Sequence, residues 1–136
     1  MKSTEIEVVR VFIEAINAGD VERLAGLMTE DHTFIDSLGN AVTGAKTIKE
    51  GWRGFFQMFS DYRNHPEGFF QEGNTVMAYG SASGTYCGKR GPVAENHIEM
   101  PAAWKAVVEG GKIKEWRVYA DWTEAHKVIE RDNEAV

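Results

Sequence analysis

The sequence predicts an α+β fold in which helices come first and a mainly antiparallel sheet follows. Up to residue 60, apolar residues recur at the three- and four-residue spacing of amphipathic helices. Beyond residue 60 the chain is rich in Val, Tyr, Trp, Phe and Thr and is divided by turn signals, which is typical of strands. Because helices and strands occupy separate parts of the chain, the α+β class is favoured over an alternating α/β arrangement.

The first two helices are indicated by their N-terminal signals. Residues 4–7 (TEIE) have the capping-box pattern, and apolar residues follow at helical spacing at Val8, Val9, Phe12, Ala15 and Ile16. Gly19 is expected to end this helix. Asp20 is then placed to cap a shorter helix, whose apolar face comprises Val21, Leu24, Leu27 and Met28.

A strand with an unusual carboxylate comes next. Phe34 and Ile35 are apolar residues that favour strands, but Asp36 is a type that strands exclude. One interpretation is that Asp36 begins the turn Asp-Ser-Leu-Gly-Asn by binding backbone amides two residues on. The other is that it points into an apolar pocket, where burial would raise its pKa and make it a base for proton transfer.

A third helix is predicted over residues 45–60. Its apolar stripe consists of Ile48, Trp52, Phe55, Phe56 and Phe59. Such an aromatic stripe is more often plain core than part of a ligand site.

Four long strands are predicted near residues 62–71, 75–87, 95–108 and 112–122, with turn signals at residues 73–74, 88–92 and 110–111. Alternation places only small residues on one face of the second of these strands, at Val76, Ala78, Gly80, Ala82 and Gly84. Either a helix packs very close to this face or a space is left open. Large side chains on the next strands share the inward direction, which favours a lined pocket, and they include Met100, Trp104, Trp116 and Val118.

Outward faces of the later strands carry Tyr79, Val107 and Tyr119. A monomer would leave this aromatic and aliphatic patch in water. The sequence therefore predicts a homodimer.

Length and charge limit the classes of protein that remain. The 136 residues predict a single domain over residues 1–136, and 15 basic against 21 acidic residues give a net charge of −6. The Lys and Arg residues are dispersed, which argues against a nucleic-acid surface. The start MKSTEIEVVR has charges where a signal peptide needs an apolar run, and no stretch approaches membrane-spanning length, so a cytoplasmic protein is expected.

The sequence lacks the residues that several kinds of catalysis and binding require. The string GSASG at residues 80–84 is similar to a nucleophile elbow, but its centre is Ala82 rather than serine. Cys87 is the only cysteine and has no evident activating partner, and the four His show no metal-ligand spacing. No Gly-rich loop with phosphate-binding spacing introduces a helix. We therefore expect no metal and no cofactor.

The chain resembles the nuclear transport factor 2-like superfamily, in its SnoaL-like and ketosteroid-isomerase-like branches. The strings that carry the resemblance are FIEAINAGDVERLAGLMTEDHTFID, then GAKTIKEGWRGFF, then GGKIKEWRVYAD, in that order and spacing. The resemblance implies a cone-shaped fold, with three N-terminal helices packed on a strongly curved, mixed and mainly antiparallel sheet that encloses an apolar pocket. It also implies frequent dimerisation through the outer face of the sheet.

Carried over by position, the resemblance matches only part of the known sites. Asp36 falls on the catalytic carboxylate of the isomerase. Its oxyanion-hole tyrosine falls at Phe12, the two supporting tyrosines fall at Met28 and Trp52, and its protonated acid falls near residues 102–104. The essential aspartate of the epoxide-hydrolase and cyclase branches falls at Val118, and the hydrolase's Arg and Asp pair falls near Gly80 and Ala82.

Two classes of function follow. In the first, the pocket binds a hydrophobic, carbonyl-bearing molecule and Asp36 transfers a proton during isomerisation, cyclisation or dehydration. In the second, the domain binds a ligand without turnover or docks a protein partner. The predicted catalytic residues are Asp36 and, as a weaker candidate, His97. Predicted ligand contacts are Phe12, Phe34, Trp52, Phe56, Tyr86, Met100, Trp104, Trp116 and Val118.

The remaining candidates are given structural interpretations. Asp121 is expected to face outward or to cap a final helix, because it differs in parity from Trp116. His32 is expected to be solvated. His65 and His126 are expected in a loop and on an exposed helix. A hydrogen-bond donor for Asp36 chemistry is limited to Tyr86, His97 or the Trp52 indole.

Overall fold

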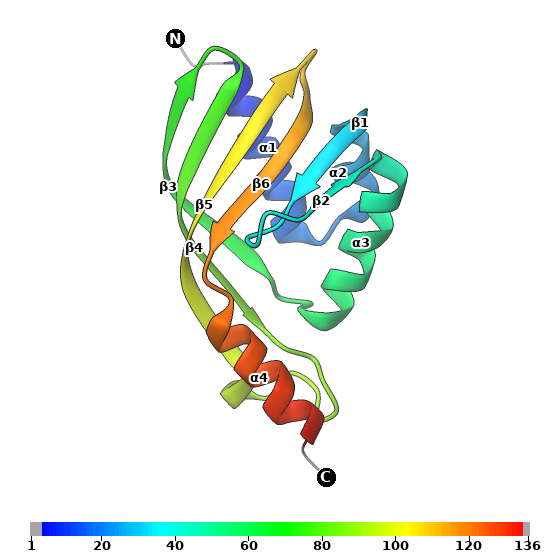
Figure 1. Ribbon diagram of the computed structural model, residues 1–136, viewed down its shortest axis with the longest axis vertical. Helices are drawn as coiled ribbons and strands as arrows, with labels where there is room; N and C mark the ends of the chain where they lie inside the picture. Colours follow the sequence, from blue (N-terminus) through cyan, green and yellow to red (C-terminus); the bar gives the residue numbers. More distant parts are fainter. Residues whose placement is uncertain (1–3, 135–136) are drawn as a thin grey trace.

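The chain folds into a curved, open sheet with helices against its inner face (Figure 1). The computed structural model describes residues 4–134. Its helices are α1 (Thr4–Ala18), α2 (Val21–Gly26), α3 (Ala45–Met58) and α4 (Thr123–Glu134), with a short 3₁₀ helix at Ala94–Asn96. Its strands are β1 (Met28–Ile35), β2 (Ala41–Thr43), β3 (Arg63–Glu72), β4 (Thr75–Thr85), β5 (His97–Glu109) and β6 (Lys112–Ala120). The α+β class is confirmed.

The sheet is mixed and strongly bent. Its strand order is β2-β1-β6-β5-β4-β3. β1 runs parallel to β6, whereas the other neighbouring pairs are antiparallel. Register shifts interrupt β3 between Pro66 and Gly68, and β6 between Ile113 and Glu115, opposite Val107 and Val108 of β5. Such irregularities increase the local twist of a strand, which fits the bending seen in Figure 1.

The helix boundaries agree with their local signals. The carboxylate of Asp20 caps α2 by accepting a hydrogen bond from the Arg23 amide at 3.0 Å. Gly19, which separates α1 from Asp20, has a φ of 63°, a conformation that suits glycine. α3 begins at Ala45, directly after Gly44.

The core lies between α1 and the inner face of the sheet. Phe12 packs against Trp116 with ring centroids 4.8 Å apart, and both are fully buried together with Trp104. The small face of β4 is also buried, at Val76, Ala78 and Ala82. A Cβ on Gly84 would lie 3.2 Å from the Phe59 ring and 3.5 Å from the Tyr62 ring. The small residues therefore allow close packing and do not line an open space.

His32 differs from its prediction. Its side chain is fully buried on β1 rather than solvated, and its Nδ1 lies 2.7 Å from the Ile113 carbonyl oxygen. Because a carbonyl only accepts, Nδ1 carries the hydrogen and donates it. Burial lowers the pKa of His32, against the opposing effect of the Ile113 carbonyl. The imidazole is therefore held in its neutral form.

Helix α4 extends the molecule away from the other helices, beside the connection between β4 and β5 (Figure 1). It is fastened by Asp132, which is fully buried. The Asp132 carboxylate accepts hydrogen bonds from the Lys89 amide at 2.6 Å, from Arg90 Nε at 3.0 Å and from Asn96 Nδ2 at 3.2 Å. Between residues 4 and 134, no helix is long and apolar enough to cross a membrane.

Candidate functional site

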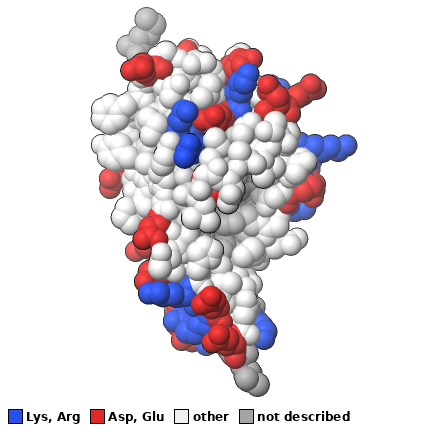
Figure 2. Space-filling view, viewed as in Figure 1, with Lys and Arg blue, Asp and Glu red and all other residues white. Residues whose placement is uncertain are grey.

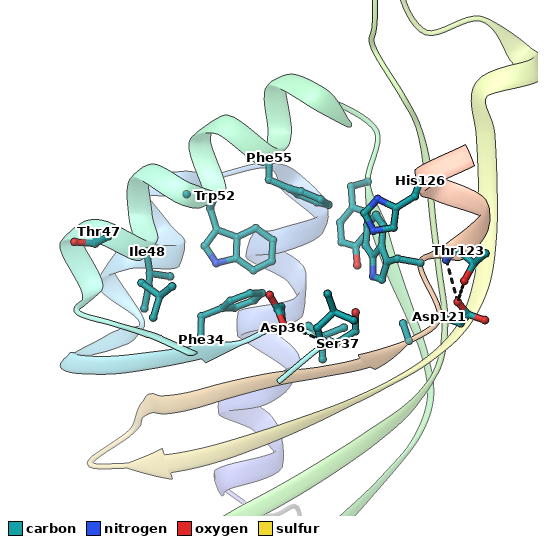
Figure 3. A pocket seen from close by; sticks show the side chains of 17 residues that line it. Phe34, Asp36, Ser37, Thr47, Ile48, Trp52, Phe55, Asp121, Thr123 and His126 are labelled. Atoms are coloured by element: carbon teal, nitrogen blue, oxygen red, sulfur yellow. Dashed lines mark hydrogen bonds between the residues drawn. The ribbon is translucent and has the colours of Figure 1, made fainter. Parts of the chain in front are cut away.

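A pocket of about 630 Å³ opens between α3, the β1–β2 connection and the junction of β6 with α4 (Figure 3). Residues 34–62 thus meet the distant residues 118–126 around one space. Its lining comprises Phe34, Asp36, Ser37, Leu38, Val42, Thr47, Ile48, Gly51, Trp52, Phe55, Tyr62, Val118, Ala120, Asp121, Trp122, Thr123 and His126.

Aromatic rings form a large part of the wall. The Trp52 indole meets the rings of Phe34 and Phe55 edge to face, with centroids 5.9 and 5.8 Å apart. At the other end, Tyr62 and Trp122 are stacked at 6.5 Å, and Tyr62 meets Phe55 edge to face at 4.8 Å. Aromatic pairs prefer such edge-to-face and offset arrangements, so the wall is held by its own packing.

The loop between β1 and β2 forms an apolar rim. Leu38 exposes 82% of its surface, and Val42 on β2 is also exposed. Both residues line the pocket. The rim is therefore in contact with solvent as well as with the pocket interior.

Asp36 closes the turn that forms this rim. Its Oδ1 accepts hydrogen bonds from the Leu38 and Asn40 amides, both at 2.9 Å, and its Oδ2 accepts one from Asn40 Nδ2 at 3.3 Å. Partial burial opposes ionisation, but the Asn40 and Leu38 amides outweigh it and hold the pKa of Asp36 below its ordinary value. The turn interpretation of Asp36 is thus seen directly, and the same carboxylate lines the pocket.

Asp121 caps helix α4, as one of its two interpretations had it. Its Oδ1 accepts hydrogen bonds from the Thr123 hydroxyl at 2.5 Å and from the Thr123 amide at 2.9 Å. The Thr123 hydroxyl and amide lower the pKa of Asp121. Figure 3 shows this cap at the α4 end of the pocket.

Tyr62 and His126 bring further polar atoms to the pocket. Burial raises the pKa of the Tyr62 phenol, so it stays protonated and can donate a hydrogen bond. His126 extends from the first turn of α4 toward the space in Figure 3. Acid, base and donor groups therefore share one largely apolar site.

The charged side chains of the pocket lining are of one sign. Among the lining residues within 4–134 there are two carboxylates, Asp36 and Asp121, and no Lys or Arg. Neither carboxylate forms an ion pair with a described residue. Both charged side chains of the lining are therefore acidic.

Four residues of the predicted site meet in this pocket, namely Phe34, Asp36, Trp52 and Val118. The other predicted ligand contacts lie outside its lining, and they are Phe12, Phe56, Tyr86, Met100, Trp104 and Trp116. His97 is exposed on β5, where its Nδ1 lies 3.0 Å from the Thr85 hydroxyl, and it too is absent from the lining. These seven residues do not line this pocket, and a role for them in binding or catalysis stays a prediction.

These residues lie outside the pocket because one part of the inner face of the sheet is covered by a helix and only another part borders the pocket. Alternation assigned Met100, Trp104 and Trp116 correctly to that face, and all three are buried. However, α1 covers the middle of the face, so these side chains form core. Phe56 packs against Trp52 at 5.4 Å without reaching the pocket, and Tyr86 lies against Phe59 at 5.6 Å.

The pocket residues that the sequence did not predict are those of the β6–α4 junction and Tyr62, which lies between α3 and β3. Trp122 and His126 are four positions apart, which places them on one side of a helix. That spacing was a usable signal, since the His126 amide donates to the Trp122 carbonyl at 2.9 Å. Tyr62 carried no comparable signal, because it stands alone between α3 and β3.

Within the described chain, no group of three or more His, Cys, Asp or Glu side chains is arranged to hold a metal ion. Asp36, Asp121 and His126 all line the pocket, but they do not form such a group. What the arrangement offers chemically is apolar contact, hydrogen bonding and proton exchange.

The fold is that of the nuclear transport factor 2-like class, as the sequence resemblance predicted. The sequence model of the SnoaL-like domain matches residues 9–116, and the chain belongs to that family. Among curated proteins, none matches the sequence.

Solved structures share the fold at low identity. A hypothetical protein with a ketosteroid isomerase-like fold from Catenulispora acidiphila, in complex with trimethylamine, is similar with a TM-score of 0.77 and 18% identity, over 91% of this chain and 92% of that one. An LEH-like epoxide hydrolase of M. tuberculosis has a TM-score of 0.77 and 16% identity, over 96% and 92%. An NTF2-like protein of unknown function from Burkholderia pseudomallei has a TM-score of 0.79 and 17% identity, over 94% and 98%. At these identities the likeness shows the fold alone.

Proposed function

We propose that this chain binds a small, hydrophobic, uncharged organic molecule in the pocket between α3 and α4. The observation that carries the proposal is the pocket itself, about 630 Å³ in volume and walled mainly by aromatic and aliphatic side chains. Sites for small molecules have volumes of roughly 300–1,000 Å³ and combine apolar walls with a few polar groups. This pocket fits that description.

The charges of the lining restrict the ligand. Hydrogen bonds hold the pKa values of Asp36 and Asp121 low, so both stay ionised near neutral pH. A carboxylate ligand would meet like charge without a Lys or Arg from the lining to compensate it. An uncharged molecule avoids that repulsion.

Two of the similar structures support a small-molecule role. The Catenulispora acidiphila protein was solved in complex with trimethylamine, and the M. tuberculosis protein is an epoxide hydrolase. Both share this fold and act on or bind an organic molecule; trimethylamine is protonated near neutral pH, so this likeness supports small-molecule binding and not the absence of charge.

Proton transfer by Asp36 is a second candidate function. It is favoured by the presence of Asp36, Tyr62 and His126 in one lining. In this version a carbonyl-bearing substrate loses a proton to the Asp36 carboxylate during isomerisation, cyclisation or dehydration, and no cofactor takes part. The low pKa of Asp36 makes it a weak base, so binding without turnover stands first.

Matched ligand series test the proposal. Bicyclic aromatic ketones, and the same skeletons carrying a carboxylate, would be compared by the shift in melting temperature. We expect the neutral set to stabilise the wild type and the carboxylates to have little effect. Val118→Trp should fill the pocket and abolish the shift, whereas Val107→Trp, on the outward side of β5, should retain it. Equal shifts in wild type and Val118→Trp would contradict binding in this pocket.

A further inference from the structure

Tyr62 is the most enclosed polar residue of the pocket. It follows α3, and only 6% of its surface is exposed. Its ring is held between Phe55, edge to face at 4.8 Å, and Trp122, stacked at 6.5 Å. Its backbone amide is satisfied by the Phe59 carbonyl at 3.2 Å. The ring position is therefore fixed from several sides.

The hydroxyl of Tyr62, by contrast, forms no hydrogen bond with any residue in the described range 4–134. Although the ring is buried, the hydroxyl oxygen itself is not enclosed and stays accessible from the pocket, where a ligand atom can reach it. Tyr86 provides an internal comparison. It is 8% exposed, and its hydroxyl lies 3.5 Å from Asn133 Oδ1. Tyr62 lines the pocket and Tyr86 does not.

The Tyr62 hydroxyl suits a ligand both by its position in the pocket and because it can donate a hydrogen bond. The carboxylates of the lining, Asp36 and Asp121, only accept hydrogen bonds and already receive them from their own turns. A ligand oxygen needs a donor. Because burial raises the pKa of Tyr62, its phenol keeps its hydrogen at physiological pH.

We propose that Tyr62 is the hydrogen-bond donor that anchors an uncharged acceptor oxygen, such as a carbonyl, of the molecule bound in the pocket. The inference rests on the proposed function and adds the polar group that the ligand must carry. It makes Tyr62 a specificity-determining residue: a ketone binds better than the hydrocarbon of the same shape because its oxygen accepts a hydrogen bond from the Tyr62 hydroxyl. Of the donors expected from the sequence, Tyr86 and His97 lie outside the pocket lining, whereas the Trp52 indole lines the pocket and is a second donor there beside Tyr62.

Prodan, a neutral fluorescent ketone whose emission moves to longer wavelength when its carbonyl accepts a hydrogen bond, is a suitable probe. Its dimethylaminonaphthalene analogue lacks the carbonyl and serves as the matched ligand. Tyr62→Phe removes the hydroxyl and keeps the ring, and Tyr86→Phe does the same outside the pocket. We expect Tyr62→Phe to raise the Kd of Prodan by about five- to tenfold, as for loss of one neutral hydrogen bond, and to shift the bound emission to shorter wavelength. Tyr86→Phe should change neither, and the analogue should bind both variants as it binds the wild type.

Equal Kd and equal emission of Prodan in the wild type and Tyr62→Phe would overturn the anchor while leaving the pocket proposal intact. Failure of Prodan and its analogue to bind the wild type, or equal binding by Val118→Trp, would instead overturn the proposed function. Melting without ligand gives an independent check. Tyr62→Phe should melt no lower than the wild type, because no internal hydrogen bond is lost, whereas a clear decrease would show that the hydroxyl is used inside the protein and would contradict the inference.

Discussion

Asp36 shows how one residue can belong both to a turn and to a pocket. Its Oδ1 holds the Leu38 and Asn40 amides at 2.9 Å, which fixes the loop that carries the apolar rim. The same hydrogen bonds stabilise the charged carboxylate and lower its pKa. The geometry that positions the carboxylate therefore also weakens it as a base.

Substitutions at Asp36 separate the two roles. Asp36→Asn retains an Oδ1 acceptor for both amides and removes the charge, so the melting temperature should change little. Asp36→Ala removes the acceptor and should lower the free energy of unfolding by about 1 kcal/mol, by analogy with lost side-chain caps. If Asp36 is a general base, turnover of a carbonyl substrate should decrease about a hundredfold or more in Asp36→Asn. Unchanged ligand affinity and turnover in Asp36→Asn would eliminate the proton-transfer function.

His32 makes stability depend on pH. Its pKa is lowered by burial in the folded chain, so below the unfolded value of 6.5 the unfolded state binds a proton that the folded state does not. The stabilising effect of neutral His32 is therefore complete above that value and is lost as the pH falls toward the folded pKa.

We expect the melting temperature of the wild type to decrease between pH of about 7.5 and 5.5, a range that largely avoids carboxylate titration. In His32→Gln this decrease should be smaller. His126→Gln, which changes an exposed histidine of α4, should keep the wild-type slope. Parallel pH profiles for the wild type and His32→Gln would show that His32 is not responsible.

Helix α4 contributes to the pocket and is held at its far end. Trp122, Thr123 and His126 line the pocket near its start, while Asp132 near its end binds the connection between β4 and β5. Asp132 is buried, and the Arg90 and Asn96 side chains lower its pKa. The anchored end thus keeps one wall of the pocket in place.

Asp132→Asn should loosen this helix. The substitution removes the charge that pairs with Arg90 and places an amide donor among donors, so we expect the melting temperature to decrease by on the order of 5 °C or more. Ligand affinity should weaken as well, because Trp122 and His126 depend on the position of α4. Glu130→Gln, an exposed change on the same helix, is the control. Wild-type melting and affinity in Asp132→Asn would contradict an anchoring role.

At the scale of elements, local signals predicted the order and most boundaries. Asp20 identified the start of α2 because a cap is a contact between close neighbours, and the turn glycines separated the long strands for the same reason. β2 was not predicted, since its three residues are all exposed and show no alternation. Its pairing with β1 depends on the turn that Asp36 closes.

The pocket was predicted less completely because its position depends on how the sheet bends. Trp104 and Trp116 face inward as their parity indicated, yet α1 covers them and the space opens further along β6, at Val118 and Ala120. Which part of an inward face is covered is a property of helix placement and not of strand pattern. Tyr62 reaches the pocket through that placement alone.

At the scale of the whole molecule, the outward face of the sheet shows few charged side chains (Figure 2), among them the Lys105–Glu115 ion pair. Here the outward patch means Phe70, Met77, Tyr79, Val107 and Tyr119. Phe70 exposes 67% of its surface and stacks on Tyr79 at 5.9 Å. Tyr79 and Tyr119 are both paired with Ala103, so they lie on the same face across three strands.

We propose that a second copy of the chain covers the outward patch, because contiguous exposed aromatic surface favours association. Light scattering or sedimentation at micromolar concentration should give twice the 15.2 kDa mass of the chain. Tyr79→Lys places a charge in the centre of the patch and should shift the population toward monomer. Met58→Lys alters an exposed apolar residue on α3, away from the sheet, and should leave the dimer unchanged. A species of 15.2 kDa alone in the wild type would contradict the dimer, and equal association by Tyr79→Lys would place any dimer interface elsewhere.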